Sequence, residues 1–315
     1  MSNNTNLHHA KNTKNDEFYT RIEDIEKELK HYKDFFKDKV VYCNCDRVDG
    51  ENRSNFFVYF VKNFKEFGLK RLICTSYNKG GKGRLCIYDD ETNGHNIIDM
   101  DGDGDFRSEE CVKWLKKCDV VVTNPPFSLF REYMAQLMEY GKKFLIVGNK
   151  NAITYKEIFP LIKENRLWLG ISAPTAYSTP LKEVENEKTQ YKENGVVYQK
   201  FGNHGWFTNI EHSNRIYPLD LYKRYDAEKY PIYDNYDAIN VDKVTDIPMD
   251  YDGVMGVPIT FLDKYCPTQF EIVDAREIGL TDKQKNKSTM LVKDADSAIN
   301  GKPTYARIMI RKIKS

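Results

Sequence analysis

The tetrapeptide Asn124-Pro125-Pro126-Phe127 carries the clearest chemical signal in the sequence. The side-chain oxygen of Asn124 and the carbonyl oxygen of Pro125 can each accept one N–H of a planar exocyclic amine. Holding both N–H groups off the ring plane frees the nitrogen lone pair for methylation. The prolines fix φ and remove competing donors, and Phe127 offers a face on which a base can stack. We expect this stretch to orient a ring amine; a Pro-Pro turn after a buried strand is the simpler alternative.

The elements around this stretch predict an α/β fold. In the first half of the chain, apolar runs typical of strands alternate with segments whose apolar residues recur every three or four positions. The expected strands are 40–45, 72–76, 120–123 and 144–147, with a hairpin at 85–98, and the expected helices are 22–36, 54–67, 108–117 and 128–140. Strands separated by helices indicate a doubly wound, mostly parallel sheet. Ligands bind beyond the carboxyl ends of such strands, and Asn124 lies at one of these ends.

Other candidate residues follow the predicted strands at the same edge. Asp46 follows the first strand, Tyr77 the second, and Asp105 and Phe106 follow the hairpin. A nucleoside-bearing cofactor needs a carboxylate for ribose or amine hydrogens and an aromatic or apolar wall for adenine. The sequence contains neither G-x-G-x-x-G nor G-x-x-x-x-G-K-[ST], the motifs that cradle phosphates. S-adenosylmethionine, which carries no phosphate, is compatible with this pattern; a solvated loop position is the alternative for each carboxylate.

The stretch from Asp99 to Glu110 also fits the calcium-loop pattern D-x-[DN]-x-[DN]-G-x5-E. However, a strand rather than a helix is predicted before it, and Phe106 occupies the apolar position. We therefore expect Asp105 and Phe106 to lie at the cofactor edge, the earlier aspartates to form a solvated turn, and the site to hold no metal. Calcium binding remains the alternative.

Composition limits the remaining possibilities. The chain has 315 residues, 40% of them hydrophobic, and a net charge of +1, so any polyanion site must be local. The longest apolar runs fall short of the roughly 18 residues of a membrane span, and the polar first 15 residues do not resemble a secretory signal. The seven cysteines form no C-x-x-C pair. We expect reduced thiols and a cytoplasmic protein.

The second half is less regular. Strands are expected at 167–171, 196–201, 206–209, 257–262, 270–274 and 306–310, with a mobile polar loop over 174–194. The polar and aromatic side chains of Asn203, His204, Trp206 and Asn209 can bond or stack with bases, although a hairpin with a core Trp is an equal alternative. Pro258 indicates an edge strand. The lysines at 283, 285, 287, 293 and 302 suggest a phosphate-contacting arm or a solvated loop.

Several stretches, in the same order along nearly the whole chain, resemble the EcoRI-like family of adenine-specific DNA methyltransferases. They are residues 14–20 (KNDEFYT), 40–46 (VVYCNCD) with 54–57 (SNFF), 102–108 (GDGDFRS), 122–127 (VTNPPF) and 253–262 (GVMGVPITFL). The resemblance implies transfer of a methyl group from S-adenosylmethionine to the N6 amine of adenine in duplex DNA. It departs from broader methyltransferases after the first strand, where residues 43–46 lead into a glycine-poor loop.

The resemblance also implies a role for each candidate residue. The residues near the methionine end of the cofactor are Phe18, Tyr19 and Thr20; Asp46 and Tyr77 flank its nucleoside, and Asp105 and Phe106 its adenine. Asn124, Pro125, Pro126 and Phe127 hold the target base, which must be flipped out of the duplex. Base reading is expected from the second half.

The expected organisation is a methyltransferase core over 1–165, a target-recognition region over 166–250, and C-terminal strands with a basic segment over 251–315. The expected partner is duplex DNA, with a restriction endonuclease as a further candidate, and the expected state is a monomer. A methyltransferase of RNA or of a protein amide is one alternative, because Asn-Pro-Pro-aromatic occurs in those enzymes too. A non-catalytic DNA-binding or calcium-binding protein on the same fold is the other.

Overall fold

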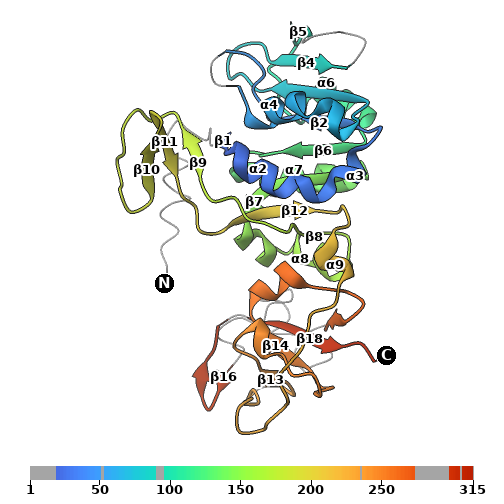
Figure 1. Ribbon diagram of the computed structural model, residues 1–315, viewed down its shortest axis with the longest axis vertical. Helices are drawn as coiled ribbons and strands as arrows, with labels where there is room; N and C mark the ends of the chain where they lie inside the picture. The colour runs from blue at the N-terminus through green and yellow to red at the C-terminus, as the bar shows by residue number, and fades with distance from the viewer. Residues whose placement is uncertain are drawn as a thin grey trace. The chain divides into compact units, whose positions relative to one another are not determined.

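The computed structural model describes residues 19–50, 53–89, 96–234, 236–273, 298–305 and 307–314. Phe18, the Asn93-Gly94 turn and the lysines 283, 285, 287 and 293 lie outside these ranges. The chain forms two compact units: unit 1 comprises 1–150 and 170–210, and unit 2 comprises 151–169 and 211–315 (Figure 1). These units cut across the expected boundaries at 165 and 250. Each unit is described by itself.

Unit 1 is built on a mixed sheet whose strands run in the order β5-β4-β3-β2-β6-β7-β12. The bounds are β2 (Val40–Cys43), β3 (Arg71–Ser76), β4 (Arg84–Tyr88), β5 (Asn96–Asp99), β6 (Val120–Thr123), β7 (Lys143–Asn149) and β12 (His204–Thr208). The strands β3, β2, β6 and β7 are parallel. The strands β4 and β5 form the expected hairpin, and β12 pairs antiparallel with β7. Unit 1 therefore has an α/β fold, and its sheet is parallel at the centre and antiparallel at both margins.

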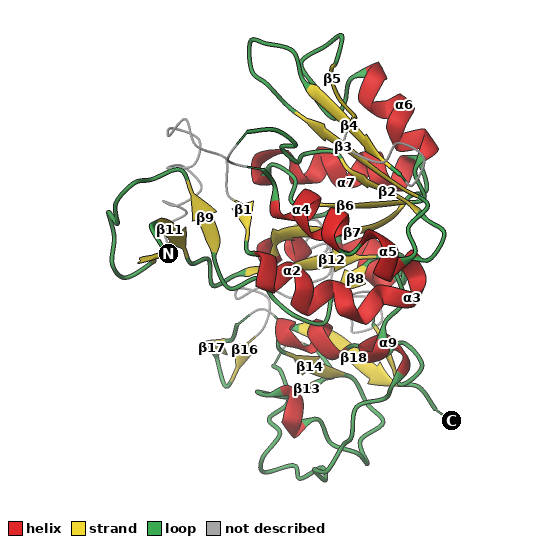
Figure 2. Ribbon diagram, turned by 45° about the horizontal axis from the view of Figure 1, so that its top comes forward, coloured by secondary structure: helices red, strands yellow, loops and turns green. Residues whose placement is uncertain are grey.

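Helices cover both faces of the parallel strands, because successive side chains of a strand point to opposite faces. One face, with Val41 and Leu72, packs on α2 and α4, while Tyr42 on the other face donates a hydrogen bond to the carbonyl of Cys111 in α6 (Figure 2). The helices of unit 1 are α2 (Ile22–Leu29), η1 (Lys30–Tyr32), α3 (Lys33–Phe36), α4 (Asn55–Lys62), α5 (Phe64–Phe67), α6 (Glu109–Lys117), η2 (Phe127–Leu129) and α7 (Phe130–Glu139).

Serines cap the start of two helices, and glycines lie at the end of two others. The Ser54 hydroxyl accepts from the N–H of Phe56, and the Ser108 hydroxyl accepts from the N–H of Cys111. Gly68 ends α5 with a φ of 60°, and Gly141, just after α7, has a φ of 59°. This left-handed conformation is one that glycine adopts without strain. These caps fix where each helix starts or stops beside the sheet.

A second sheet of unit 1 corrects the prediction of a mobile loop over 174–194. Two strands lie within that stretch, and the sheet order is β1-β9-β11-β10. Its bounds are β1 (Tyr19–Thr20), β9 (Tyr177–Thr179), β10 (Gln190–Glu193) and β11 (Val196–Gln199). All pairs are antiparallel (Figure 2). The polar composition of the stretch conceals strands whose partners, β1 and β11, come from elsewhere in the chain.

Unit 2 contains a four-stranded sheet of order β13-β14-β18-β15. The elements are η3 (Lys150–Thr154), which begins at the last residue of one stretch of unit 1, α8 (Phe159–Lys163), β8 (Trp168–Leu169), α9 (Ser213–Ile216), β13 (Ile239–Asn240), η4 (Val244–Asp246), β14 (Met255–Val257), η5 (Ile259–Lys264), β15 (Phe270–Ile272), β16 (Ala298–Ile299), β17 (Lys302–Pro303) and β18 (Ile308–Lys312). The prediction of an edge strand at 257–262 is wrong. The strand β14 ends at Val257 and lies inside the sheet, and a 3₁₀ helix follows Pro258. Pro258 has no N–H to donate to a neighbouring strand, so the strand ends before it.

Arg215 organises the interior of unit 2. Its guanidinium lies 4.5 Å from the Trp168 ring centroid and 5.1 Å from that of Tyr265, and it donates to the side-chain oxygen of Asn165 at 2.9 Å. Burial lowers the pKa of this arginine. Two aromatic faces thus replace the carboxylate that a buried cation usually needs.

All seven cysteines are free thiols. None of the helices in the described ranges is long and apolar enough to cross a membrane.

Candidate functional site

Asp46 joins the carboxyl ends of the central strands of unit 1. It follows β2, and its N–H donates to the carbonyl of Thr75 in β3. Its carboxylate accepts a hydrogen bond from the Thr123 hydroxyl at 2.5 Å, at the end of β6, and a short one from the Ser54 hydroxyl, the N-cap of α4. Burial raises the pKa of Asp46 to about 6. Asp46 is 3% exposed, so its carboxylate bonds these two hydroxyls in the interior, at the edge where the resemblance places the nucleoside of a cofactor.

Asn44, two residues earlier, places a buried donor at the same edge. Its side-chain oxygen accepts a short hydrogen bond from the Tyr133 hydroxyl of α7. Its Nδ2 is buried and has no hydrogen-bond partner among the residues that the structure describes. A buried donor without a partner is costly, so this atom is suited to a ligand. Asn44 was not predicted from the sequence.

Asp105 and Phe106 lie between the hairpin and α6. The carboxylate of Asp105 accepts two hydrogen bonds from the Arg107 guanidinium, at 2.9 and 2.7 Å, and this guanidinium lowers the pKa of Asp105. Asp105 is half-buried, whereas Phe106 is buried, with its ring 5.0 Å from that of Tyr133. Arg107 was missed from the sequence, although an arginine two residues after an aspartate is a spacing that allows such a pair.

Tyr77 follows β3 and is 54% exposed, so its ring is accessible to a ligand. The backbone at this strand end is tightly packed: a Cβ on Gly104 would lie 2.2 Å from the carbonyl oxygen of Ser76. Gly104 also has a φ of 81°, which glycine tolerates best. The glycine thus lets the loop carrying Asp105 approach the end of β3.

The Asp99–Glu110 stretch is occupied by internal bonds. A carboxylate oxygen of Glu110 accepts from the N–H groups of Asp101 and Gly102, at 3.2 and 3.4 Å. Asp99 forms a short ion pair with Arg84. Within the described residues, no group of three or more His, Cys, Asp or Glu side chains could hold a metal ion. The aspartates therefore form a bonded turn beside the cofactor edge.

Asn124 directly follows the buried strand β6, and Phe127 begins η2. The Pro126 carbonyl accepts from the N–H of Leu129 at 3.0 Å, which closes the turn into the helix. Asn124 and Phe127 are both half-buried. Strand, proline pair and helix thus hold the tetrapeptide in a fixed turn at the carboxyl edge of the sheet, as predicted.

The residues predicted to contact DNA do not share one surface. Trp206 is fully buried and packs edge-on against Phe56, with ring centroids 6.0 Å apart. The side chain of Asn209 bonds the backbone of Phe144 and Lys142. Stacking on a base needs an exposed ring, so Trp206 has a core role and Asn209 binds the margin of the sheet.

Asn203 is exposed, and its amide donates to Asn149 at 3.3 Å. His204, by contrast, is 5% exposed. Its Nδ1 is 2.9 Å from the Tyr177 hydroxyl, and its ring centroid is 4.5 Å from that of Phe127. His204 thus lies against the tetrapeptide instead of facing solvent.

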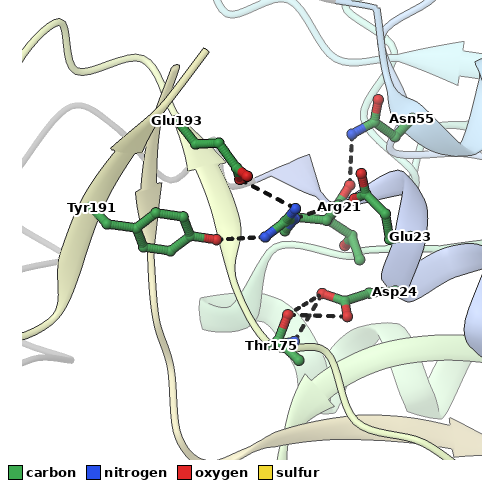
Figure 3. Close-up of polar contacts among 8 residues, drawn as sticks. Arg21, Glu23, Asp24, Asn55, Thr175, Tyr191 and Glu193 are labelled. Atoms are coloured by element: carbon green, nitrogen blue, oxygen red, sulfur yellow. Dashed lines mark hydrogen bonds and ion pairs between the residues drawn. The ribbon is translucent and has the colours of Figure 1, made fainter. Parts of the chain in front are cut away.

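Strand β1 carries Tyr19 and Thr20, which were predicted to lie near the methionine end of a cofactor. The Asn55 amide donates to the Thr20 carbonyl at 2.8 Å, which joins β1 to the start of α4 (Figure 3). The Thr20 hydroxyl is buried, and the described residues offer it no hydrogen-bond partner. Thr20 therefore presents a second buried polar atom suited to a ligand.

Arg21, which sequence reasoning missed, holds β1 to the β10–β11 hairpin. Its guanidinium donates to the Tyr191 hydroxyl at 2.6 Å and lies 3.4 Å from the carboxylate of Glu193 (Figure 3). It also lies 4.9 Å from the ring centroid of Tyr198. Hydrogen bonds thus connect β1 with both the hairpin and α4.

The residues present fit S-adenosylmethionine. The Thr20 hydroxyl and the Asn44 amide are buried polar atoms awaiting partners among the described residues. Asp105 supplies a carboxylate, and Tyr77 an exposed ring. A phosphate-free cofactor also matches the lack of a phosphate-binding glycine loop in the sequence.

Comparisons with known proteins show the family to which the chain belongs. The family described as "Adenine-specific methyltransferase EcoRI" matches residues 6–313. The Type II methyltransferase M.EcoRI of Escherichia coli is 46% identical over 333 residues, covering 97% of this chain and 95% of the relative. The Type II methyltransferase M.MpnI of Mycoplasma pneumoniae is 39% identical, covering 96% and 97%. M.MgeORF184P of Mycoplasma genitalium is 38% identical, covering 97% and 99%. The chain belongs to the EcoRI family of adenine-specific methyltransferases and is a Type II DNA methyltransferase that uses S-adenosylmethionine.

Proposed function

We propose that this enzyme methylates the N6 amine of an adenine flipped out of duplex DNA, with Asn124, Pro125, Pro126 and Phe127 holding the base. The observation that carries the proposal is the fixed turn of this tetrapeptide after β6, at the edge where Thr123 bonds Asp46. Bound S-adenosylmethionine supplies a methyl group already activated by a sulfonium. The protein then contributes mainly proximity and orientation.

In this proposal each residue of the tetrapeptide has a separate task. The Asn124 oxygen and the Pro125 carbonyl each accept one N–H of the adenine amine, which directs the lone pair toward the methyl donor. Pro126 keeps the turn rigid. Phe127 stacks on the flipped base and offsets part of the few kcal/mol, roughly, that flipping costs. A strong base is not needed before attack, because the amine becomes acidic only after it is methylated.

We further propose that Phe18, Tyr19 and Thr20 line the methionine end of the cofactor, that Tyr77 lies beside its nucleoside, and that Asp105 and Phe106 bind its adenine. The Thr20 hydroxyl, which has no hydrogen-bond partner among the described residues, supports the first assignment. Because Asp46 is enclosed by Ser54 and Thr123, its proposed role changes from contacting the cofactor to shaping the edge that receives it. We also propose the doubly wound methyltransferase fold for unit 1, because its central strands are parallel and the chain belongs to a methyltransferase family.

Target recognition is proposed for the stretch 166–250. Exposed Asn203 is retained as a candidate for base contacts; His204, Trp206 and Asn209 are assigned to supporting positions because their side chains are buried or bonded internally. We also propose a cytoplasmic monomer acting on duplex DNA, with a restriction endonuclease as its counterpart.

Methyl transfer from labelled S-adenosylmethionine to separate DNA, RNA and protein pools tests the proposed substrate. We expect label in duplex DNA only, as N6-methyladenine. Label in RNA or protein would replace this proposal by one of the alternative acceptors. Sequencing that detects modified bases, with and without the protein expressed, then identifies the recognised site.

A further inference from the structure

Two buried rings, those of His204 and Tyr177, pack against the ring of Phe127. The His204 ring, from β12, lies with its centroid 4.5 Å from that of Phe127, tilted by 49°. The Tyr177 ring, from β9, lies 6.2 Å away at 87°, an edge-to-face contact. Tyr177 is fully buried and His204 is 5% exposed. The orientation of Phe127 is therefore set by side chains from two distant parts of the chain.

A single hydrogen bond fixes this pair of supporting rings. The Tyr177 hydroxyl and His204 Nδ1 are 2.9 Å apart. Burial lowers the pKa of His204 to about 4, so the imidazole is neutral near pH 7 and contributes shape and one hydrogen bond, not charge. An imidazole held in this way cannot rotate without leaving a buried polar atom unpaired.

Tyr177 also reaches the strand proposed to line the cofactor. Its backbone lies opposite Thr20 of β1 in an antiparallel ladder, and opposite Gln199 of β11. The main chain of Tyr177 therefore pairs with β1. Its side chain bonds His204, which packs on Phe127 of the tetrapeptide. Tyr177 thus connects β1 to the tetrapeptide through one ladder pair and one side-chain hydrogen bond.

The segment leading into Tyr177 is itself anchored on α2. The Glu28 carboxylate accepts from the N–H of Ile171 at 2.9 Å and from the N–H of Ser172 at 2.6 Å. The Asp24 carboxylate accepts from the N–H of Thr175 at 2.8 Å (Figure 3). Asp24 and Glu28 are four residues apart on one face of the helix, so both bind the segment that leads into β9. Tyr177 thus occupies a position fixed by packed secondary structure.

We propose that Tyr177 and His204 form a positioning pair that holds the Phe127 ring, and with it the target adenine, in register with strand β1. The proposal rests on the proposed function, in which Phe127 stacks on the base and β1 lines the cofactor. Neither residue touches the reacting atoms; both act through Phe127. Losing the pair should slow methyl transfer without weakening cofactor binding, because misplacing reacting groups by a fraction of an ångström to about 1 Å costs up to ~100-fold in rate.

The test uses three variants of the full chain: Tyr177→Phe, His204→Phe and the double variant. Tyr177→Phe keeps the ring and the backbone ladder but removes the hydroxyl. The double variant removes both polar partners, so it leaves no buried group unpaired and should recover stability. Tyr42→Phe is the matched control, because Tyr42 is also fully buried and its hydroxyl bonds Thr75 at 2.9 Å, away from Phe127.

Single-turnover methyl transfer, cofactor affinity and thermal stability are measured for each variant. A duplex with 2-aminopurine at the methylated position adds a direct report of stacking on the flipped base. We expect Tyr177→Phe and the double variant to transfer methyl groups about 10-fold more slowly than wild type, with the cofactor Kd changed less than twofold and altered 2-aminopurine emission. Tyr42→Phe should keep the wild-type rate and emission.

Recovery of rate together with stability in the double variant would show a merely structural role and overturn the inference. So would a Tyr177→Phe rate equal to that of Tyr42→Phe. Both results are distinct from a failure of the proposed function, in which Asn124→Ala would stay active or wild-type protein would not methylate adenine in DNA.

Discussion

The Thr123 hydroxyl donates to the Asp46 carboxylate at 2.5 Å, which joins the end of β2 to the residue immediately before Asn124. The other carboxylate oxygen receives the Ser54 hydroxyl at the start of α4. One buried acid therefore links the ends of β2 and β6 to the N-terminus of α4.

Asn124→Ala tests the central assignment. Removing the side-chain oxygen should reduce the single-turnover rate by at least ~100-fold, since the group acts mainly in the transition state. Affinity for S-adenosylmethionine, measured by calorimetry, should stay within about twofold because the residue contacts the target amine. A near-wild-type single-turnover rate would show that Asn124 does not orient the amine.

Thr123→Val should show how much the hydrogen bond to Asp46 contributes to the free energy of unfolding. The substitution keeps the β-branched shape but leaves one oxygen of a buried carboxylate short of a donor, at a cost of roughly 1–3 kcal/mol in unfolding free energy. Asp46→Asn alone should cost a similar amount, and the double variant should cost less than the sum, because the two changes remove one interaction. Strictly additive costs in denaturant unfolding would mean that the bond contributes nothing.

Asp46 and His204 should affect the free energy of unfolding in opposite directions as the pH falls. The folded-state pKa of Asp46 is raised from 3.8 to about 6, so this group favours folding below pH 3.8 and loses that contribution as the pH rises to about 6. The pKa of His204 is lowered from 6.5 to about 4. The unfolded state then binds more protons across this window, so the His204 contribution falls as the pH drops from 6.5 to about 4.

The two contributions nearly cancel in the wild type between about pH 4 and 6. Asp46→Asn should leave the His204 slope alone, so that variant should lose stability on acidification relative to wild type. His204→Phe should gain stability relative to wild type over the same interval. Urea unfolding at several pH values measures both differences, and identical pH slopes in all three proteins would contradict the pKa directions.

Thr20→Val separates ligand binding from folding. The Thr20 hydroxyl is buried and finds no protein partner within the described ranges, so replacing it with a methyl group should leave the stability of the cofactor-free protein unchanged or raised. Cofactor affinity should fall by ~1 kcal/mol, the typical worth of one hydrogen bond. A clear loss of stability in the cofactor-free protein would assign the hydroxyl to the fold instead.

Local signals made much of unit 1 predictable. The apolar run before Asn124 forms β6 as expected, and the serine caps and the glycines after α5 and α7 act within a few residues of the helix ends that they define. The hairpin of β4 and β5 was also predicted, but the antiparallel pairing of β12 with β7 was not, because an apolar run does not specify the direction of its partner. Strand β9 was hidden for a related reason: its stability comes from β1 and β11, which are distant in sequence.

Two of the residues predicted to contact DNA in the second half are buried, which the sequence did not indicate. His204 and Trp206 have side chains that can read or stack on bases, but pairing of β12 with β7 brings both into the interior. Side-chain chemistry alone does not reveal which face of a strand is covered. Arg21 was missed because its partner Tyr191 is far away in the sequence and only the fold brings the two together. Arg107 lies two residues from Asp105, so its pairing could have been predicted from the spacing.

Asp105→Ala should lower the affinity for S-adenosylmethionine by roughly 1–3 kcal/mol if its carboxylate binds the adenine amine, since a buried donor would be left unpaired. The carboxylate also holds Arg107, so Arg107→Ala is the control that removes the ion pair but keeps the acid. It should weaken cofactor binding less than Asp105→Ala does. Calorimetry with calcium, with and without cofactor, completes the test: tight calcium binding and unchanged cofactor affinity in Asp105→Ala would favour a calcium loop.

Sequence recognition should depend on exposed side chains of the proposed recognition region. Asn203→Ala should weaken binding to the cognate duplex by ~1–3 kcal/mol and leave binding to a scrambled duplex unchanged, as expected for a base-edge contact. Lysines at 283, 285 and 287, which lie outside the described residues, were predicted to contact phosphates. Their replacement should weaken both duplexes equally and flatten the salt dependence.

Lys65→Ala is the matched control for these lysines, because it removes one exposed positive charge from α5. Loss of a phosphate contact at Lys285 should reduce the slope of log K against log salt by about one unit, whereas Lys65→Ala should leave the slope unchanged. Affinities for both duplexes across a salt series provide the measurement. Should Asn203→Ala leave the ratio of cognate to scrambled affinity intact, base reading belongs to other side chains, because a residue that contacts a base edge must discriminate between the two duplexes.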